Sequence, residues 1–163
     1  ASYWISEPQW NLALHPNRRE KASFLTENIM PIKESGQLKL ITLPPFQSST
    51  SLQEIKFTEA ISCLVVHGHT EAMLLPKIKM GNETIVFMAD LLPSTGHIPL
   101  PYVMGYDMQP LITLEEKEKF LTTALKENYI LFFEHDAVNE CCRLIETEKG
   151  IRAGASFALK EIL

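Results

Sequence analysis

The sequence contains no run of Lys and Arg, no long apolar segment and few cysteines, and each absence narrows its possible functions. Its 15 Lys and Arg residues are scattered among 20 Asp and Glu residues, giving a net charge of −5. Without a basic patch, the chain has no electrostatic basis for binding the phosphate backbone of a nucleic acid. No apolar run approaches the roughly 20 residues that cross a bilayer, and the N-terminus lacks the basic flank and apolar middle of a signal peptide. We therefore expect no nucleic-acid partner, no membrane partner and a cytoplasmic location.

The three cysteines, Cys63, Cys141 and Cys142, do not suggest a disulfide framework. They cannot all pair within one chain, and a bridge between the adjacent Cys141 and Cys142 would be strained on a strand. No C-x-x-C spacing occurs, which favours packing of small apolar side chains over a thiolate metal site. A reducing compartment fits this pattern.

The apolar content is that of one ordinary globular domain. The chain has 163 residues, of which 45% are hydrophobic, so residues 1–163 suffice for a single substantial core. It begins at Ala1, and its first residues already predict a strand followed by a helix. We therefore expect the chain to be a piece of a longer protein.

Apolar periodicity and turn residues predict an α+β chain. The spacing of Ser6 and Gln9 predicts a helix N-terminus, and Asn17 with Glu20 repeats this pattern for a second helix. Between residues 54 and 88, four strand-like segments separated by turn residues predict an antiparallel meander.

An irregular segment and another helix follow the meander. The segment Leu91–Pro110 is rich in proline and too long for a simple connection, so we expect it to be functional. Thr113 and Glu116 predict the start of an amphipathic helix, which a strand at Ile130–Glu134 and a C-terminal hairpin follow. Earlier in the chain, a Ser/Thr cluster at residues 48–51 predicts a loop.

Three apolar, strand-like runs each end on a residue that can bind a metal. One run leads into the turn His67-Gly68-His69, a second leads into Asp90, and a third leads into His135. Strand ends along one edge of a sheet can converge, and imidazole and carboxylate ligands suit zinc, iron or manganese. The recurrence predicts that His69, Asp90 and His135 form one metal site.

These segments resemble the C-terminal half of the metallo-β-lactamase superfamily. Gly68-His69-Thr70 matches the start of that family's G-H-T/S-x-G-H motif, and residues 86–90 match the strand that delivers its metal-bridging aspartate. Residues 133–136 match the strand that delivers its last histidine ligand. The resemblance covers nearly the whole chain and is greatest for the lactonases and the organophosphate-hydrolase-like members. The family's H-x-H-x-D-H signature, which supplies four ligands from the N-terminal half, does not occur here.

The resemblance implies a fold and an activity. The implied fold is the C-terminal half of an αββα four-layer sandwich, with a mainly antiparallel sheet flanked by helices. His69 would bind one of two divalent metal ions and His135 the other, with zinc the first choice and iron or manganese the alternatives. Asp90 would bridge the two ions and act as the catalytic residue that exchanges a proton. A metal-bound hydroxide would hydrolyse a small-molecule ester, lactone or phosphoester, and His97 would bind this substrate.

The strand-like runs at residues 61–66 and 130–133 are apolar on both faces, which predicts a sheet buried from both sides. The missing N-terminal half, or a second copy of the chain, would cover the sheet face opposite the helices. Two alternatives stay open. One is a mononuclear site that uses His67, His69 and His135, and the other is a non-catalytic interaction module that retains half of the fold.

Overall fold

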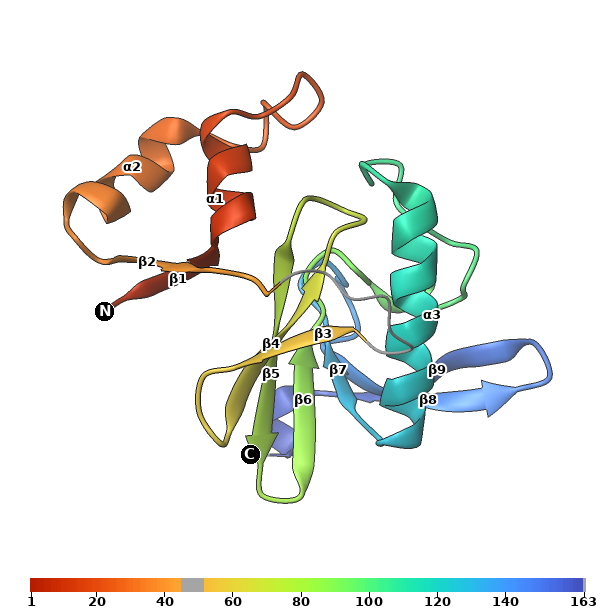
Figure 1. The fold of residues 1–163 in the computed structure, drawn as a ribbon. Coiled ribbons are helices and arrows are strands. Elements are labelled where there is room, and N and C mark those ends of the chain that lie inside the picture. The colour runs from red at the N-terminus through yellow and green to blue at the C-terminus, as the bar shows by residue number, and fades with distance from the viewer. Residues whose placement is uncertain (45–51, 163) are drawn as a thin grey trace.

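A computed structural model describes residues 1–44 and 52–162, which form an N-terminal lobe and a seven-stranded sheet (Figure 1). The loop predicted at residues 48–51 lies outside these described residues. No helix within them is long and apolar enough to span a membrane. The elements are, in chain order, β1 (Tyr3–Ser6), α1 (Glu7–Leu14), α2 (Thr26–Glu34), β2 (Leu38–Ile41), β3 (Gln53–Lys56), β4 (Ile61–Val66), β5 (Met73–Met80), β6 (Glu83–Phe87), η1 (Thr95–His97), α3 (Pro110–Lys126), β7 (Ile130–Phe132), β8 (Cys141–Thr147), β9 (Gly150–Phe157) and η2 (Leu159–Glu161).

The N-terminal lobe contains α1, α2 and a two-stranded parallel sheet of β1 and β2. Ser6 caps α1 as predicted, because its hydroxyl accepts a hydrogen bond from the Gln9 N–H at 3.2 Å. A second hydrogen bond from the same hydroxyl to the Ala72 carbonyl, at 2.8 Å, ties the lobe to the main sheet.

The second predicted helix begins later than its capping pattern indicated. The Asn17 side chain accepts hydrogen bonds from the N–H groups of Arg19 and Glu20, yet residues 18–23 form only turns and α2 begins at Thr26. Such local side-chain hydrogen bonds stabilise turns as well as helix starts, so the pattern alone could not distinguish the two.

The seven-stranded sheet follows chain order from β3 to β9. Neighbouring strands are antiparallel except β6 and β7, which are parallel and are connected through α3. This arrangement confirms the predicted α+β class and the antiparallel meander. Figure 1 shows α3 running across the sheet near β7 and β8, with the N-terminal lobe on the other side of the molecule.

Helix α3 begins three residues before the predicted capping residue Thr113. Its first residue is Pro110, whose fixed φ and missing N–H suit the first turn of a helix. Glu116 lies inside the helix, and its carboxylate reaches out to another segment instead of capping. The helix packs Phe120, Leu121 and Ala124 against the sheet in the main core.

The sheet face opposite α3 carries a row of isoleucines across four strands. Ile61 pairs with Ile78, Ile78 with Ile85, and Ile85 with Ile130, so the four side chains share a face. Ile85 and Ile130 are buried, in part against residues at the C-terminus, whereas Ile61 and Ile78 remain 44% and 41% exposed. The predicted burial from both sides is therefore confirmed for the centre of the sheet, and one end of this face is open.

Candidate metal centre

Strand direction places the three predicted ligands at one edge of the sheet. Strands β4 and β6 are both antiparallel to β5 and therefore run in the same direction, and β7 is parallel to β6. The C-terminal ends of β4, β6 and β7 consequently lie at the same edge. His69 follows β4, Asp90 follows β6 and His135 follows β7, so the sheet order alone brings these residues to one place.

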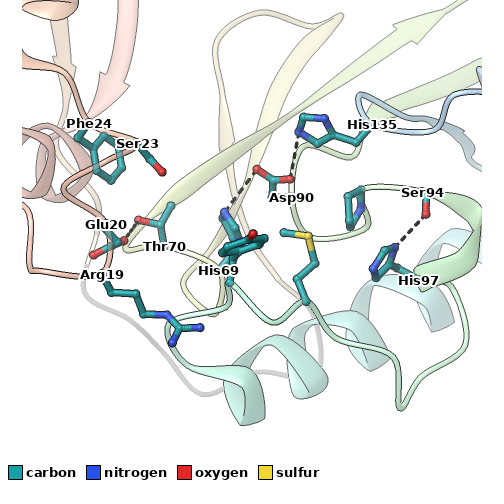
Figure 2. A pocket seen from close by; sticks show the side chains of 13 residues that line it. Arg19, Glu20, Ser23, Phe24, His69, Thr70, Asp90, Ser94, His97 and His135 are labelled. Carbon is teal, nitrogen blue, oxygen red and sulfur yellow. Dashed lines mark hydrogen bonds and ion pairs between the residues drawn. The ribbon is translucent and has the colours of Figure 1, made fainter.

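Asp90 lies between the two histidines and presents one carboxylate oxygen to each (Figure 2). Its Oδ2 is 3.4 Å from Nε2 of His69, and its Oδ1 is 3.5 Å from Nε2 of His135. The three predicted site residues are thus brought together, with His69 and Asp90 largely shielded and the His135 side chain 57% exposed.

The spacing of these atoms fits a pair of ligands sharing an ion. Two ligands at about 2.1 Å from a tetrahedral zinc ion lie about 3.4 Å from each other, which matches both nitrogen–oxygen distances. Imidazole nitrogen and carboxylate oxygen are also ordinary zinc donors. Each histidine with its facing oxygen of Asp90 would therefore supply two of the four donors that one ion requires.

No group of three or more His, Cys, Asp or Glu side chains within residues 1–44 and 52–162 is arranged to hold a single metal ion. His67, the third member of the predicted mononuclear alternative, instead has its Nδ1 3.0 Å from Oε1 of Glu71 and does not line the cavity at the sheet edge. The predicted mononuclear alternative is therefore wrong. His67 contacts Glu71, whereas His69 faces Asp90 and Asp107.

The local backbone positions Asp90 and His135. Ala89, which precedes Asp90, has a φ of 42°, a left-handed conformation that is uncommon for residues other than glycine. This conformation lies in the turn that follows β6 and contains Asp90. The His135 N–H donates a hydrogen bond to the Pro93 carbonyl at 3.1 Å, so the loop after Asp90 also fixes the backbone of His135.

Asp107 orients His69 and is a site residue for which the sequence analysis assigned no role. Its Oδ1 lies 3.0 Å from Nδ1 of His69, while its Oδ2 accepts a hydrogen bond from the Met104 N–H at 3.1 Å. Burial alone would lower the pKa of His69, but the hydrogen bond to Asp107 and the charges of Asp90, Asp107 and Glu20 raise it above its ordinary value. A carboxylate on the far nitrogen is the usual partner of a metal-binding histidine, because it holds the ring so that Nε2 faces the metal.

The long segment after Asp90 forms a wall of a cavity of about 510 Å³ at this sheet edge. The side chains of this segment that line the cavity are Pro93, Ser94, His97, Met104 and Tyr106. The opposite wall comes from the turns of the N-terminal lobe and includes residues 19, 20, 23 and 24. Apolar and polar groups are therefore mixed around the three candidate ligands.

His97 lies in this wall, with its Nδ1 2.9 Å from the hydroxyl oxygen of Ser94 (Figure 2). Burial is the main cause that lowers the pKa of His97, and the charge of Lys117 adds to it against the opposing charge of Asp107. The lowered pKa favours the neutral imidazole, whose other nitrogen does not take part in the Ser94 contact.

Lys117, a buried residue of α3, fixes another part of the same segment. Its amine donates hydrogen bonds to the carbonyls of Pro99, Leu100 and Tyr102 at 3.2, 3.2 and 2.6 Å. These three carbonyls lie outside the strands and helices, and the charge-assisted hydrogen bonds from one ammonium group hold their irregular backbone in place.

The fold is shared with solved structures of hydrolases. A probable metal-dependent hydrolase from Staphylococcus aureus has a TM-score of 0.77 and 21% sequence identity, over 95% of this chain and 51% of its own. The hydrolase AbOPH, described as a member of the β-lactamase superfamily, has a TM-score of 0.75 and 16% identity, over 96% of this chain and 56% of its own. AidC, a dizinc quorum-quenching lactonase in complex with a product, has a TM-score of 0.69 and 20% identity, over 96% and 55%.

The chain therefore spans about half the length of these proteins, and the predicted resemblance in fold is confirmed. No protein-family profile matches the sequence. No curated protein sequence matches it either.

Proposed function

We propose that this chain supplies part of a dinuclear metal site that hydrolyses an ester, a lactone or a phosphoester. The observation that carries the proposal is the position of Asp90, whose two carboxylate oxygens each face a different histidine at 3.4 and 3.5 Å. A carboxylate placed in this way is suited to bridge two ions, with His69 on one and His135 on the other. The metal-dependent and dizinc hydrolases of similar fold support this assignment.

The residues of the chain have separable tasks in this proposal. His69 and His135 hold the metal ions through Nε2, and Asp107 keeps His69 in the orientation that allows this. Bound divalent ions, with zinc favoured by the donor set, would activate a water molecule and polarise the substrate. Asp90, next to the reacting centre, is placed to accept a proton and to return it.

His97 is the proposed substrate contact. Its imidazole lies in the same cavity wall as Pro93 and Ser94, which belong to the long segment after Asp90. The ring nitrogen that does not contact Ser94 would form a hydrogen bond to a substrate oxygen. If the Ser94 hydroxyl donates to Nδ1, the proton of the neutral ring is on Nε2, which would then be the donor to the substrate. The apolar wall residues beside it favour a small molecule with an apolar part.

We further propose that a partner surface completes the ligand sets and covers the open end of the isoleucine row. Ile61 and Ile78 are large apolar side chains that remain substantially exposed beside a buried sheet core. The solved structures of similar fold are about twice as long, so the missing N-terminal half is the first choice and a second copy of the chain is the second. The alternative function, a non-catalytic interaction module, would use the same surface without the metal.

Zinc binding to the purified chain, measured by titration calorimetry, tests the site. We expect weak binding by the wild-type chain, because it supplies two donors for each ion, and a loss of that binding in His69→Ala, Asp90→Ala and His135→Ala. His15→Ala, which removes an exposed histidine outside the cavity, is the matched control and should bind like the wild type. Unchanged zinc binding in Asp90→Ala would refute the bridging role. Hydrolysis of ester, lactone and phosphoester substrates is assayed with zinc present, in the wild type and in the variants that lose zinc binding.

A further inference from the structure

The turn that carries His69 is attached to α3 by a single buried carboxylate. Glu116 Oε1 accepts a hydrogen bond from the His67 N–H at 2.7 Å, and Oε2 accepts one from the Gly68 N–H at 3.0 Å. The side chain of Glu116 is buried, and both of its oxygens are used by successive backbone N–H groups of the turn. These N–H groups lie just beyond the end of β4, where the ladder of the sheet no longer supplies acceptors.

The carbonyl groups of the same turn are held from the start of α3. The Gly68 carbonyl accepts a hydrogen bond from the Gln109 N–H at 2.8 Å, and the His69 carbonyl accepts one from the Met108 N–H at 3.2 Å. The Gln109 side chain adds a hydrogen bond to the His67 carbonyl at 3.3 Å. The turn is therefore fixed on both its donors and its acceptors by residues 108–116.

The approach of α3 to the turn leaves no room for a side chain at position 68. A Cβ atom on Gly68 would lie 2.3 Å from both the backbone nitrogen and the hydroxyl oxygen of Thr113. Because this contact is with helix backbone, it cannot be relieved by moving a flexible side chain. The backbone of the turn thus packs directly against the helix, at the position where Glu116 can accept hydrogen bonds from His67 and Gly68.

We infer that Glu116 is a positioning residue for His69: it fixes the turn from which the imidazole reaches Asp90 on one side and Asp107 on the other. The inference rests on the proposed function in one respect, that His69 is a metal ligand. A carboxylate suits this task because it offers two acceptors at the spacing of two successive N–H groups. The amide of glutamine would offer one acceptor and place an N–H group against the other N–H.

Two substitutions, Glu116→Ala and Glu116→Gln, test this role in the full chain against the matched control Glu118→Ala. Glu118 is an exposed acidic residue two positions further along α3, so its removal changes the charge of the helix without touching the turn. The measurements are the imidazole nitrogen signals of His69 by NMR, amide hydrogen exchange at His67 and Gly68, and affinity for zinc. Urea unfolding shows that each variant compared is folded.

We expect Glu116→Ala to speed exchange at both amides, to change the His69 ring signals and to lower zinc affinity by about 10- to 100-fold. Glu116→Gln should cause a smaller loss, because one acceptor remains, and Glu118→Ala should match the wild type in all three measurements. A folded Glu116→Gln or Glu116→Ala chain with wild-type ring signals and zinc affinity would overturn the inference. If Glu116→Ala does not fold, Glu116→Gln decides.

The result also separates this inference from the proposed function. Zinc affinity that survives His69→Ala would refute the metal site, whatever Glu116 does. Unchanged His69 ring signals in the metal-free Glu116→Gln chain would refute the positioning role, even if zinc binding requires His69.

Discussion

His69 and Asp107 form a shielded contact, with Nδ1 and Oδ1 separated by 3.0 Å and the Asp107 side chain only 1% exposed. The contact leaves Nε2 as the nitrogen that faces Asp90. An aspartate in this position fixes the ring orientation and strengthens the imidazole as a ligand. Removing its charge should therefore weaken metal binding without removing a ligand.

We expect Asp107→Asn to lower the zinc affinity of the chain by about 10- to 100-fold, as measured by titration calorimetry. Asparagine keeps the shape of the side chain and its hydrogen bond to the Met104 N–H, so the loss would report on the His69 contact. Glu71→Gln is the matched control, because Glu71 contacts His67 instead of His69. An Asp107→Asn chain that binds zinc like the wild type would show that the contact does not orient a ligand.

Gly68→Ala should strongly destabilise the fold. The new Cβ would lie 2.3 Å from the Thr113 nitrogen, well inside van der Waals contact with helix backbone. Overpacking of this kind costs about 1–3 kcal/mol or more in the free energy of unfolding, which urea denaturation measures. Gly105→Ala is the control, since a Cβ there would have no atom within 4 Å, and should change the free energy by less than about 0.5 kcal/mol. Equal stability of the two variants would contradict the close approach of α3.

The buried amine of Lys117 should make the free energy of unfolding depend on pH. Burial lowers the pKa of its amine from 10.5 to about 8, in spite of the opposing charge of Asp107. Between these two values the unfolded chain binds more protons than the folded chain, so the contribution of Lys117 to stability increases as the pH rises through this window. The increase amounts to about 3 kcal/mol in total.

Urea unfolding of the wild type and of Lys117→Met across this pH window measures the effect. We expect the stability of the wild type relative to the variant to rise with pH, because the variant has no amine to titrate. Lys126→Met, which removes an exposed lysine of the same helix, is the control. A wild-type advantage that falls with pH would show that the amine is more easily protonated in the folded chain.

The sequence predicted the parts of this molecule that local periodicity determines. The alternation and turn residues of the β4–β6 region indicate the meander, and the meander fixes the directions that bring His69 and Asp90 to one edge. Asp107 and Glu116 could not be found in this way. They act across 38 and 48 residues of sequence, as single side chains in a loop and in a helix, and no repeating pattern connects them to His69.

The cysteines give a last prediction, on chemical reactivity. All three are free and buried, as the absence of a C-x-x-C spacing indicated. Burial raises the pKa of the thiols of Cys63 and Cys141 to about 11 and that of Cys142 to about 12. The thiolate is the reactive form, and with these pKa values less than about 1% of each thiol is ionised near pH 8. We expect iodoacetamide to label none of the three quickly in the folded chain and all three in urea, as counted by mass spectrometry. Rapid labelling of one cysteine without denaturant would place that thiol at an accessible surface and contradict its packing in the sheet.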